Sequence, residues 1–252
     1  MNNTTINQLN QLNQQFYQKV ASSFDQTRRQ AWVGWKQLLP EIIALKNFSD
    51  EPIKVLDLGC GNARFAEFLS ESGVEYQYLG VDSNPQLLVK AKEKLLADKH
   101  QFQELDLVEL QLDKNQLSSH FQSQYDLVVA FGLLHHIPSF NLRAELIKQT
   151  ISLLKNSHSL AIFATWQFAS EERFQKKLIN PEVTGIDPAQ LEENDYLLGW
   201  QDRENCYRYC HFVDEKEMTK LFKEAGNDKL ISSFFADGKS EKLNHYYILK
   251  QN

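Results

Sequence analysis

The chain has 252 residues, of which 42% are hydrophobic and 24% charged, with a formal net charge of −6. This composition suits one α/β domain with additions, and the acidic balance argues against a broad nucleic-acid-binding surface. No run approaches the roughly 20 apolar residues of a membrane span, and the amino terminus resembles no secretory signal. Three cysteines are too few for a disulfide framework. We therefore expect a cytoplasmic protein.

An amphipathic helix is predicted from about residue 6, because apolar side chains recur there at helical spacings of three and four. These side chains are Leu9, Leu12, Phe16 and Val20. A second helix is expected after Asp25, and Pro40 should begin a new turn, because a proline inside a helix removes a hydrogen bond. Residues 1–50 are therefore assigned to cap helices that can cover a cleft in the domain formed by residues 51–252.

From residue 53 onward, apolar runs alternate with helical stripes, which is typical of a parallel sheet with helices on both faces. Strands are expected near 53–58, 76–81, 101–105, 125–130 and 159–165. The clearest helices are 84–97 and 140–155. Residues 166–212 interrupt the alternation, and we expect this insertion after the fifth strand to fold over the cleft and shape the substrate site.

The final segment predicts a helix followed by a hairpin. A helix over 214–225 ends at Gly226, and strands are expected at 230–235 and 246–250. The four residues from Ala236 to Lys239 include a glycine and an aspartate, which is typical of a turn.

The most informative motif follows the first predicted strand and reads Asp57-Leu58-Gly59-Cys60-Gly61. Gly59 permits a tight turn with positive φ, and Gly61, which has no Cβ, lets a ligand approach the backbone. Asp82 ends the second predicted strand, where a carboxylate can accept both hydroxyls of a ribose. Together these residues predict an adenosine cofactor at the carboxyl ends of the strands.

The two-glycine form of this turn favours one adenosine cofactor over another. NAD sites usually need a third glycine further into the helix, next to the pyrophosphate, and that position is Arg64 here. The shorter Asp-x-Gly-x-Gly form resembles motif I of the S-adenosylmethionine-dependent methyltransferases, whose cofactor has no phosphate. This resemblance implies S-adenosyl-L-methionine as the cofactor. It also implies a Rossmann-like α/β fold with a seven-stranded, mostly parallel sheet and an antiparallel last strand.

Residues that follow the other strands complete the expected cofactor site. Ser83 comes directly after Asp82, and after the third strand Asp106 can accept the adenine amino hydrogen while Leu107 packs on the ring. Cys60 is more simply explained by packing inside the turn. The full set of expected cofactor contacts is Asp57, Gly59, Cys60, Gly61, Asp82, Ser83, Asp106, Leu107, Phe131 and Trp32.

Two adjacent histidines, His135 and His136, follow the fourth predicted strand. They can form structural hydrogen bonds beneath the methyl donor, contact the acceptor or bind a metal. A structural zinc site needs four ligands, and the spacing of the remaining histidines and cysteines supplies no such set, so no metal is expected. Cys206 and Cys210 are likewise assigned to packing.

Across most of its length the sequence resembles the tRNA wobble-uridine carboxymethyl methyltransferases, which include the methyltransferase domain fused to an AlkB-like hydroxylase. Besides the cofactor turn, the similar segments are Val20 to Arg28 with Trp32, Arg208-Tyr209-Cys210-His211-Phe212 and Asn244 to Ile248. The chain also departs from that family. The prolines beside the opening tryptophan are Ala31 and Val33 here, and Pro-Gly-Gly before the fifth strand is Asn156-Ser157-His158.

The resemblance implies O-methylation of the carboxymethyl group of a tRNA wobble uridine, with tRNA and a small activator subunit as candidate partners. A carboxylate acceptor is ionised at neutral pH and needs no catalytic base, so the protein has to place it. The candidates for that placement are Arg28, His135, Arg208 and His211. The alternatives are a small-molecule methyltransferase with a carboxylate or hydroxyl acceptor, and a non-catalytic subunit that binds S-adenosylmethionine.

Overall fold

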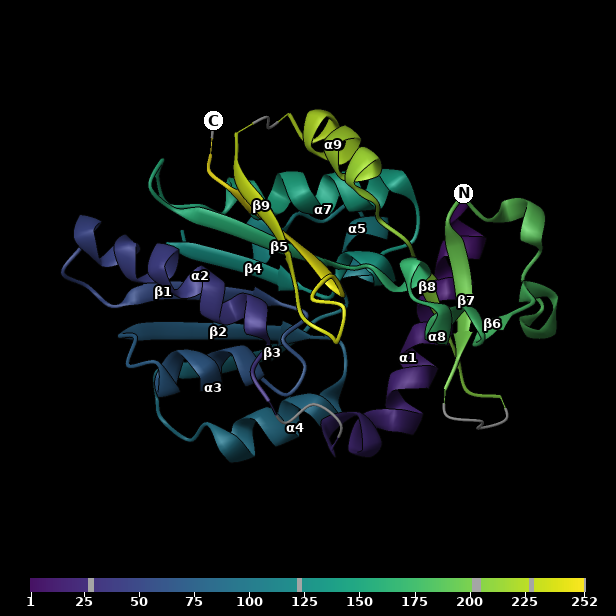
Figure 1. Cartoon of the computed structure of the whole chain (residues 1–252), viewed down its shortest axis with the longest axis horizontal. Coiled ribbons are helices and arrows are strands. Elements are labelled where there is room, and N and C mark those ends of the chain that lie inside the picture. Colours follow the sequence, from purple (N-terminus) through teal and green to yellow (C-terminus); the bar gives the residue numbers. More distant parts are fainter. Residues whose placement is uncertain (27–29, 122–123, 201–204, 227–228, 252) are drawn as a thin grey trace.

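The computed structural model describes residues 1–26, 30–121, 124–200, 205–226 and 229–251, with only the backbone described for 22–26. Its centre is a seven-stranded sheet in the order β3-β2-β1-β4-β5-β10-β9 (Figure 1). The strands are β1 (Ile53–Leu58), β2 (Tyr76–Asp82), β3 (His100–Glu104), β4 (Leu127–Phe131), β5 (Leu160–Trp166), β9 (Leu230–Ala236) and β10 (Asn244–Leu249). Only β10 runs antiparallel to its two neighbours in this sheet of described residues, which confirms the predicted fold class.

Helices cover both faces of the sheet, and each face has its own hydrophobic core. One core holds α2 (Val33–Ala44), α3 (Arg64–Glu71) and α4 (Pro85–Lys94). The other holds α5 (Leu107–Leu112), α6 (Leu117–His120), α7 (Phe140–Ser152) and α9 (Glu215–Glu224). All five residues of β4 are buried, because a central parallel strand is covered on both sides.

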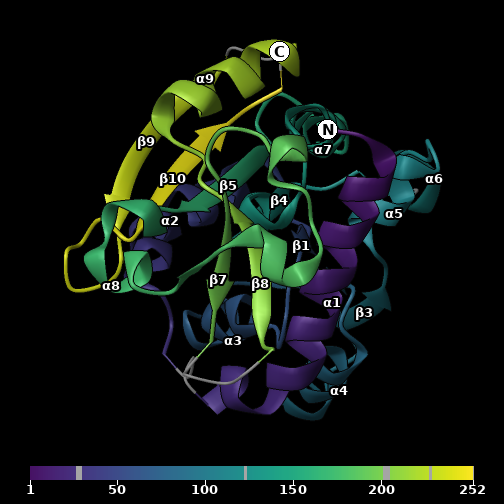
Figure 2. The same cartoon turned by 90° about the vertical axis from the view of Figure 1, so that its right-hand side faces the viewer.

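The insertion forms a second sheet at the carboxyl ends of the main strands. It contains α8 (Glu172–Gln175) and the antiparallel strands β6 (Leu178–Ile179), β7 (Asp195–Gly199) and β8 (Tyr207–His211). In Figure 2, β7 and β8 lie in front of the ends of β1, β4 and β5. Short 3-10 helices complete the chain at Leu45–Phe48, Leu134–His136, Phe168–Ser170, Pro181–Thr184 and Pro188–Gln190.

The amino-terminal helix α1 (Asn3–Gln26) lies beside β8 and packs against the insertion (Figure 2). Leu9 shares a hydrophobic cluster with Tyr209, and Phe16 shares another with Cys206. These contacts bury the apolar side that the helical spacing predicted. Among the described residues, no helix has both the length and the apolar character needed to cross a membrane.

The prediction for Pro40 was wrong, because this proline lies inside α2 and does not begin a new turn. A proline in a helix leaves the carbonyl four residues earlier without its usual donor, and that residue is Lys36. Both Lys36 and Pro40 are exposed, whereas Trp35 and Leu38 are buried. The lost hydrogen bond therefore lies on the solvent side of α2, where its cost is smallest.

Candidate functional site

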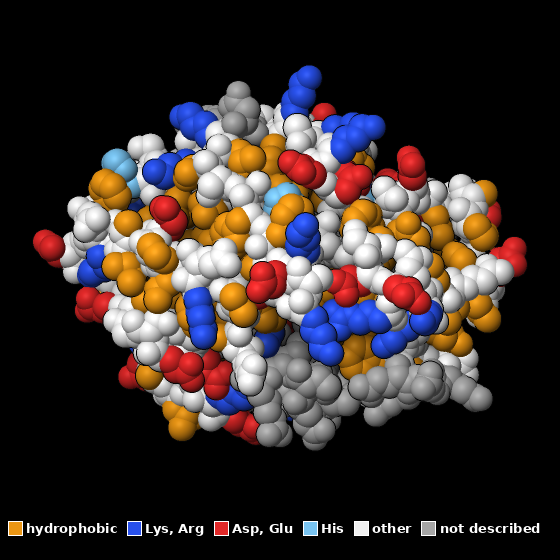
Figure 3. Space-filling view, in the orientation of Figure 1, with side chains coloured by type: hydrophobic (Ala, Val, Ile, Leu, Met, Phe, Trp, Pro, Cys, Tyr) orange, Lys and Arg blue, Asp and Glu red, His pale blue; other side chains and the backbone are white. Residues whose placement is uncertain are grey.

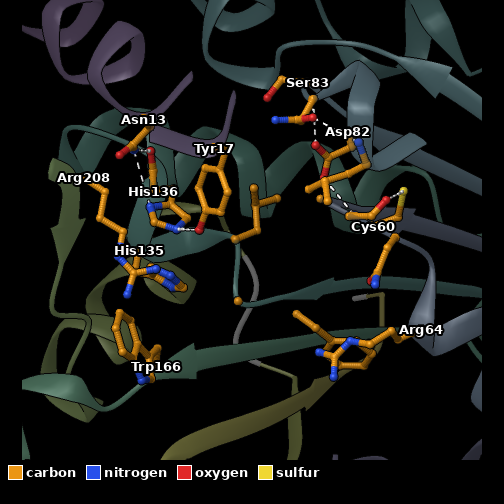
Figure 4. Close-up of a pocket in the computed structure, with 18 of the residues that line it drawn as sticks. Asn13, Tyr17, Cys60, Arg64, Asp82, Ser83, His135, His136, Trp166 and Arg208 are labelled. Atoms are coloured by element: carbon orange, nitrogen blue, oxygen red, sulfur yellow. Dashed lines mark hydrogen bonds between the residues drawn. The ribbon is translucent and has the colours of Figure 1, made fainter. Parts of the chain in front are cut away.

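A cavity of about 1570 Å³ lies at the carboxyl ends of the main-sheet strands. Its walls come from the glycine turn after β1, the ends of β2 and β3, the loop after β4, helix α1 and the insertion (Figure 4). Pockets for one drug-sized ligand usually measure about 300–1,000 Å³. The volume is therefore sufficient for a cofactor and an acceptor side by side.

The turn after β1 has the backbone conformation that its glycines predicted. The φ angle is 75° at Gly59 and 56° at Gly61. The amides of Gly59 and Cys60 donate to the carbonyl of Val81, with N···O distances of 2.8 and 2.9 Å, which ties the turn to β2. Asp82 adds a second tie, because its Oδ2 accepts a hydrogen bond of 2.8 Å from the amide of Gly61.

Asp57 is buried in the wall behind this turn. Its Oδ2 accepts a hydrogen bond of 2.6 Å from the hydroxyl of Tyr78. Burial raises the pKa of Asp57 to about 7, although the hydrogen bond from Tyr78 opposes this rise. Asp57 therefore gains or loses its proton near neutral pH, inside the cavity.

Asp106, predicted to bind the adenine amino group, already accepts hydrogen bonds from side chains of helix α1. Its Oδ1 accepts hydrogen bonds from the amides of Val108 and Glu109, which caps α5. Its Oδ2 accepts from Asn10 at 3.0 Å and from Gln14 at 2.8 Å. An adenine amino group at this position would share Asp106 with these two amides. Asn10 and Gln14 were not predicted as part of this site. Their only signal in the sequence is their spacing of one helical turn on a polar face.

Every residue predicted to bind the cofactor lines this one cavity; these are Asp57, Gly59, Cys60, Gly61, Asp82, Ser83, Asp106, Leu107, Phe131 and Trp32. The ring of Trp32 stacks on Trp35 with centroids 5.1 Å apart, and the guanidinium of Arg64 lies 5.6 Å from the Trp32 ring. The structure thus brings the predicted residues together, and their contact with a cofactor stays a prediction.

Arg208 lies deep in the same cavity, on β8 of the insertion. Its side chain is buried, and its guanidinium carbon lies 4.6 Å from the ring centroid of Trp166, 5.2 Å from Phe16 and 5.6 Å from Trp200. Within the described part of the chain, its buried Nε has no hydrogen-bond partner. Figure 4 shows Arg208 beside His135 and Trp166. Because a buried charge is costly unless it is paired, a guanidinium placed in this way can bind an anionic ligand.

The two histidines after β4 both line the cavity. The Nε2 atom of His136 lies 2.7 Å from the hydroxyl of Tyr17, and its Nδ1 lies 3.0 Å from the carbonyl oxygen of Tyr209. The fold also brings Cys210 to the pair, with ligand atoms of all three residues within 4.8 Å of one another. Sequence spacing did not reveal this approach. Because both nitrogens of His136 already make hydrogen bonds, the arrangement fits a hydrogen-bonding role better than metal binding.

The remaining acceptor candidates are placed differently. His211 does not line the cavity described above, and its two ring nitrogens lie 2.7 Å from Asp195 and 2.6 Å from Glu217. Both nitrogens are thus engaged by carboxylates, which leaves neither for an acceptor. Arg28 lies outside the described residues.

Comparisons with known proteins identify one family and its fold. The model of the family described as "Methyltransferase domain" matches residues 25–230. A protein of Encephalitozoon cuniculi named "Putative methyltransferase" is 25% identical over 211 residues, which cover 84% of each chain. An S-adenosylmethionine-dependent methyltransferase from Clostridium acetobutylicum matches with a TM-score of 0.63 and 15% identity, covering 94% of this chain and 99% of that one. Magnesium protoporphyrin IX methyltransferase from Synechocystis, solved with bound SAH, matches with a TM-score of 0.58 and 15% identity, covering 95% of this chain and 98% of that one.

Proposed function

The chain belongs to the methyltransferase domain family, and on this premise we propose that it transfers a methyl group from S-adenosylmethionine to an acceptor whose anionic group binds Arg208. The observation that carries the proposal is the buried guanidinium of Arg208, whose Nε has no partner in the described chain. It faces the same cavity as the glycine turn.

In this proposal, the residues of the cavity bind either the cofactor or the acceptor, according to their position. When bound, S-adenosylmethionine supplies an electrophilic methyl group on a sulfonium. Asp82 is placed to accept the ribose hydroxyls, and Asp57 lies where a carboxylate can stabilise the cationic end of the cofactor. Arg208 orients the acceptor through charge-assisted hydrogen bonds, and the aromatic rings around it exclude water and strengthen them.

Two kinds of acceptor fit an anionic anchor at Arg208. The sequence resemblance suggests the carboxymethyl group of a tRNA wobble uridine, with an activator subunit that would supply further RNA-binding surface. A small organic anion is the second kind, favoured by a cavity that α1 and β8 cover and by the net charge of −6. Lys and Arg side chains gather near α8 (Figure 3), where Arg173 and Lys177 line the rim of the cavity. These side chains can attract either acceptor.

The test is transfer of radiolabelled methyl from S-adenosylmethionine to two acceptor pools. One is total tRNA from a strain that lacks the gene, and the other is a mixture of small hydroxylated and non-hydroxylated carboxylates and phosphates. We expect Arg208→Met to lose about tenfold or more of the labelling, since a hydrogen bond to a charged group contributes about 1.5–3 kcal/mol. Its affinity for S-adenosylhomocysteine, measured by calorimetry, should stay within about twofold of the wild type.

Lys36→Met is the control, because it removes a cation from an exposed position that does not line the cavity. Equal labelling by the wild type and Arg208→Met would overturn the assignment of Arg208.

The tRNA acceptor has its own test. Mass spectrometry of nucleosides from the deletion strain should show carboxymethyl-uridine accumulating, and an unchanged profile would rule that acceptor out.

A further inference from the structure

Four side chains form a strip along one wall of the cavity, with a cation at each end and two aromatic rings between the cations. The guanidinium carbon of Arg208 lies 4.6 Å from the ring centroid of Trp166. The ring of Phe174 comes next, with its centroid 4.7 Å from that of Trp166. At the other end, the guanidinium carbon of Arg173 lies 4.7 Å from the centroid of Phe174. All four side chains line the cavity, so a ligand there can contact the whole strip.

The two cations of the strip lie at different depths. Arg208 on β8 is only 4% exposed, and Figure 4 shows it beside Trp166. The side chain of Arg173 on α8 is 52% exposed, in the region where Lys and Arg side chains gather in Figure 3. The strip therefore runs from the inside of the cavity to its rim.

The rim end of the strip keeps hydrogen-bond donors for a ligand. The Nε atom of Arg173 lies 3.3 Å from one oxygen of Glu171, whose other oxygen accepts a hydrogen bond of 2.5 Å from the hydroxyl of Ser240. This pairing orients the guanidinium and leaves both of its Nη atoms without a hydrogen-bond partner among the described residues. Lys177 comes just after α8, lines the same cavity and makes no ion pair within the part of the chain that the structure describes.

Positive and negative side chains line different parts of the cavity. Carboxylates such as Asp57 and Asp82 follow strands of the main sheet, at the predicted cofactor site. The insertion contributes Arg173, Lys177 and Arg208, and no carboxylate among its described residues that line the cavity. Because opposite charges attract, the positive sulfonium of the cofactor fits the first part and an anion fits the strip.

From this arrangement we propose that the acceptor is an elongated organic anion with a flat, apolar body and two anionic ends. Arg208 holds one end inside the cavity, and Arg173 with Lys177 holds the other end at the rim. The body lies along the rings of Trp166 and Phe174. The inference rests on the proposed function and narrows its acceptor to a small molecule with two anionic groups.

The charges around the rim favour such a small molecule over tRNA. Arg173 and Lys176 are each paired with a neighbouring glutamate, and the net charge of the chain is −6. Binding to a phosphate backbone rests on many cations that neutralise successive phosphates. The rim offers enough positive charge for one anionic group.

The first experiment measures binding and needs no methyl transfer. Biphenyl-4,4′-dicarboxylate and biphenyl-4-carboxylate share a body of two rings, which matches the two rings of the strip, and differ by one carboxylate. In calorimetry with the intact protein saturated with S-adenosylhomocysteine, we expect the diacid to bind about fivefold more tightly, near the upper limit for an exposed ion pair. This advantage should shrink at high salt, because salt screens exposed charges more than buried ones.

Substitutions at the two ends should have different effects. The double variant Arg173→Met, Lys177→Met should bind the diacid no better than the monoacid, and bind the monoacid within about twofold of the wild type. Arg208→Met should weaken the binding of both acids by about tenfold or more, because its ion pair is buried. The double variant Lys36→Met, Lys176→Met is the matched control, since it removes two exposed cations that do not line the cavity.

The flat body has its own comparison. Azelate is a diacid with a flexible chain and no ring, so it can reach both cations without stacking on Trp166 or Phe174. We expect azelate to bind about fivefold more weakly than the biphenyl diacid, since contacts between aromatic rings add to the burial of apolar area. Equal affinities would overturn the stacked body.

Three results would overturn the anchor at the rim. One is equal affinity of the wild type for the diacid and the monoacid. Another is a dissociation constant above about 1 mM for both acids, which would mean that the strip binds no such anion. The third is labelling of tRNA that depends on Arg208, because the acceptor would then be a macromolecule. None of these touches the proposed function, which fails only if Arg208→Met labels as well as the wild type.

Discussion

Asp82 supports the cofactor site in two ways at once. Its two oxygens accept hydrogen bonds of 2.8 Å from the amides of Gly61 and Asn84, and its side chain lines the cavity. Asp82→Ala removes these acceptors together with the predicted ribose partner. Because each hydrogen bond to a charged group contributes about 1.5–3 kcal/mol, we expect the affinity for S-adenosylhomocysteine to fall by about 100-fold. Calorimetry measures this, with Asp98→Ala as control because Asp98 is exposed and does not line the cavity. Binding by Asp82→Ala within about threefold of the wild type would contradict the assignment.

From the raised pKa of Asp57 we predict that binding of the cofactor releases a proton. Burial raises its pKa to about 7, so below that pH the carboxyl of the free protein is mostly protonated. A bound cation favours the ionised carboxylate and lowers the pKa, so affinity should rise with pH up to about 7 and then level off. Calorimetry near pH 6.5, in buffers of different ionisation enthalpy, should detect the released proton in the wild type and a loss of that release in Asp57→Asn. Equal proton release by both proteins would contradict this role.

The walls of the cofactor site could be predicted from the sequence because each lies directly after a strand. Gly59 and Asp82 are in this position, and parallel strands bring such residues to one edge of the sheet. The contact of Asn10 with Asp106 joins residues 96 positions apart, and no local pattern shows which polar side chain of a helix meets which carboxylate. The pairing of Tyr17 with His136, 119 positions apart, was hidden for the same reason.

Helix α2 is held against the terminal hairpin by a close approach at Gly34. A Cβ built on Gly34 would lie 2.3 Å from the ring of Tyr246. That ring has little room to move, because it stacks on Phe234 with centroids 5.0 Å apart and its hydroxyl donates to Asp237 at 2.6 Å. Asp237 also accepts from the amide of Gly34, at 3.0 Å.

We therefore expect Gly34→Ala to reduce the free energy of unfolding by about 1–3 kcal/mol, which is the usual cost of overpacking. The intrinsic preference of a helix for alanine over glycine, about 1 kcal/mol, acts in the opposite direction. Urea denaturation measures the net effect. Val33→Ala, at the exposed neighbouring position, controls for changes in helix propensity. A higher urea midpoint for Gly34→Ala would mean that the hairpin moves aside.

Whole elements were predictable where burial leaves a regular pattern. The hydrophobic run in β4 is continuous because both faces of the strand are covered. The apolar residues of α1 recur at helical spacing because one side of the helix packs on the insertion. The three-stranded sheet of the insertion was not predicted. Its strand β6 has two residues, too few to show an alternation, and its ends are set by pairing with β7.

At the scale of the whole molecule, buried ion pairs connect the insertion to the main domain. Arg143 on α7 is almost fully buried, and its Nη2 lies 2.8 Å from Glu192 of the insertion and 2.9 Å from Glu217 on α9. Glu192 also accepts a hydrogen bond from the amide of Phe140 at the start of α7. His211 on β8 joins the same network through Glu217. The wall that carries Arg208 is thus anchored by ion pairs as well as by packing.

This anchoring makes stability depend on pH through His211. Burial alone would lower the pKa of His211, but hydrogen bonds to Asp195 and Glu217 outweigh it and raise the pKa above its ordinary value. A raised pKa means that the folded protein binds the proton more tightly than the unfolded chain. The stabilisation is therefore complete below the unfolded pKa of about 6.5 and is lost as pH rises through the higher folded value.

We expect the free energy of unfolding of the wild type to exceed that of His211→Gln most at about pH 6, and the difference between the two proteins to shrink steadily above about pH 6.5. Urea denaturation at several pH values measures this difference, in which the contributions of other titrating groups such as Asp57 cancel. His120→Gln is the control, because His120 is exposed and lies outside the network. A difference that stays constant between about pH 6 and 9 would mean that His211 holds no extra proton in the folded protein. Among the charged groups of this network, Arg143 would then hold the insertion without a charged His211. The wall that carries Arg208 would be no less firmly held at alkaline pH than at neutral pH.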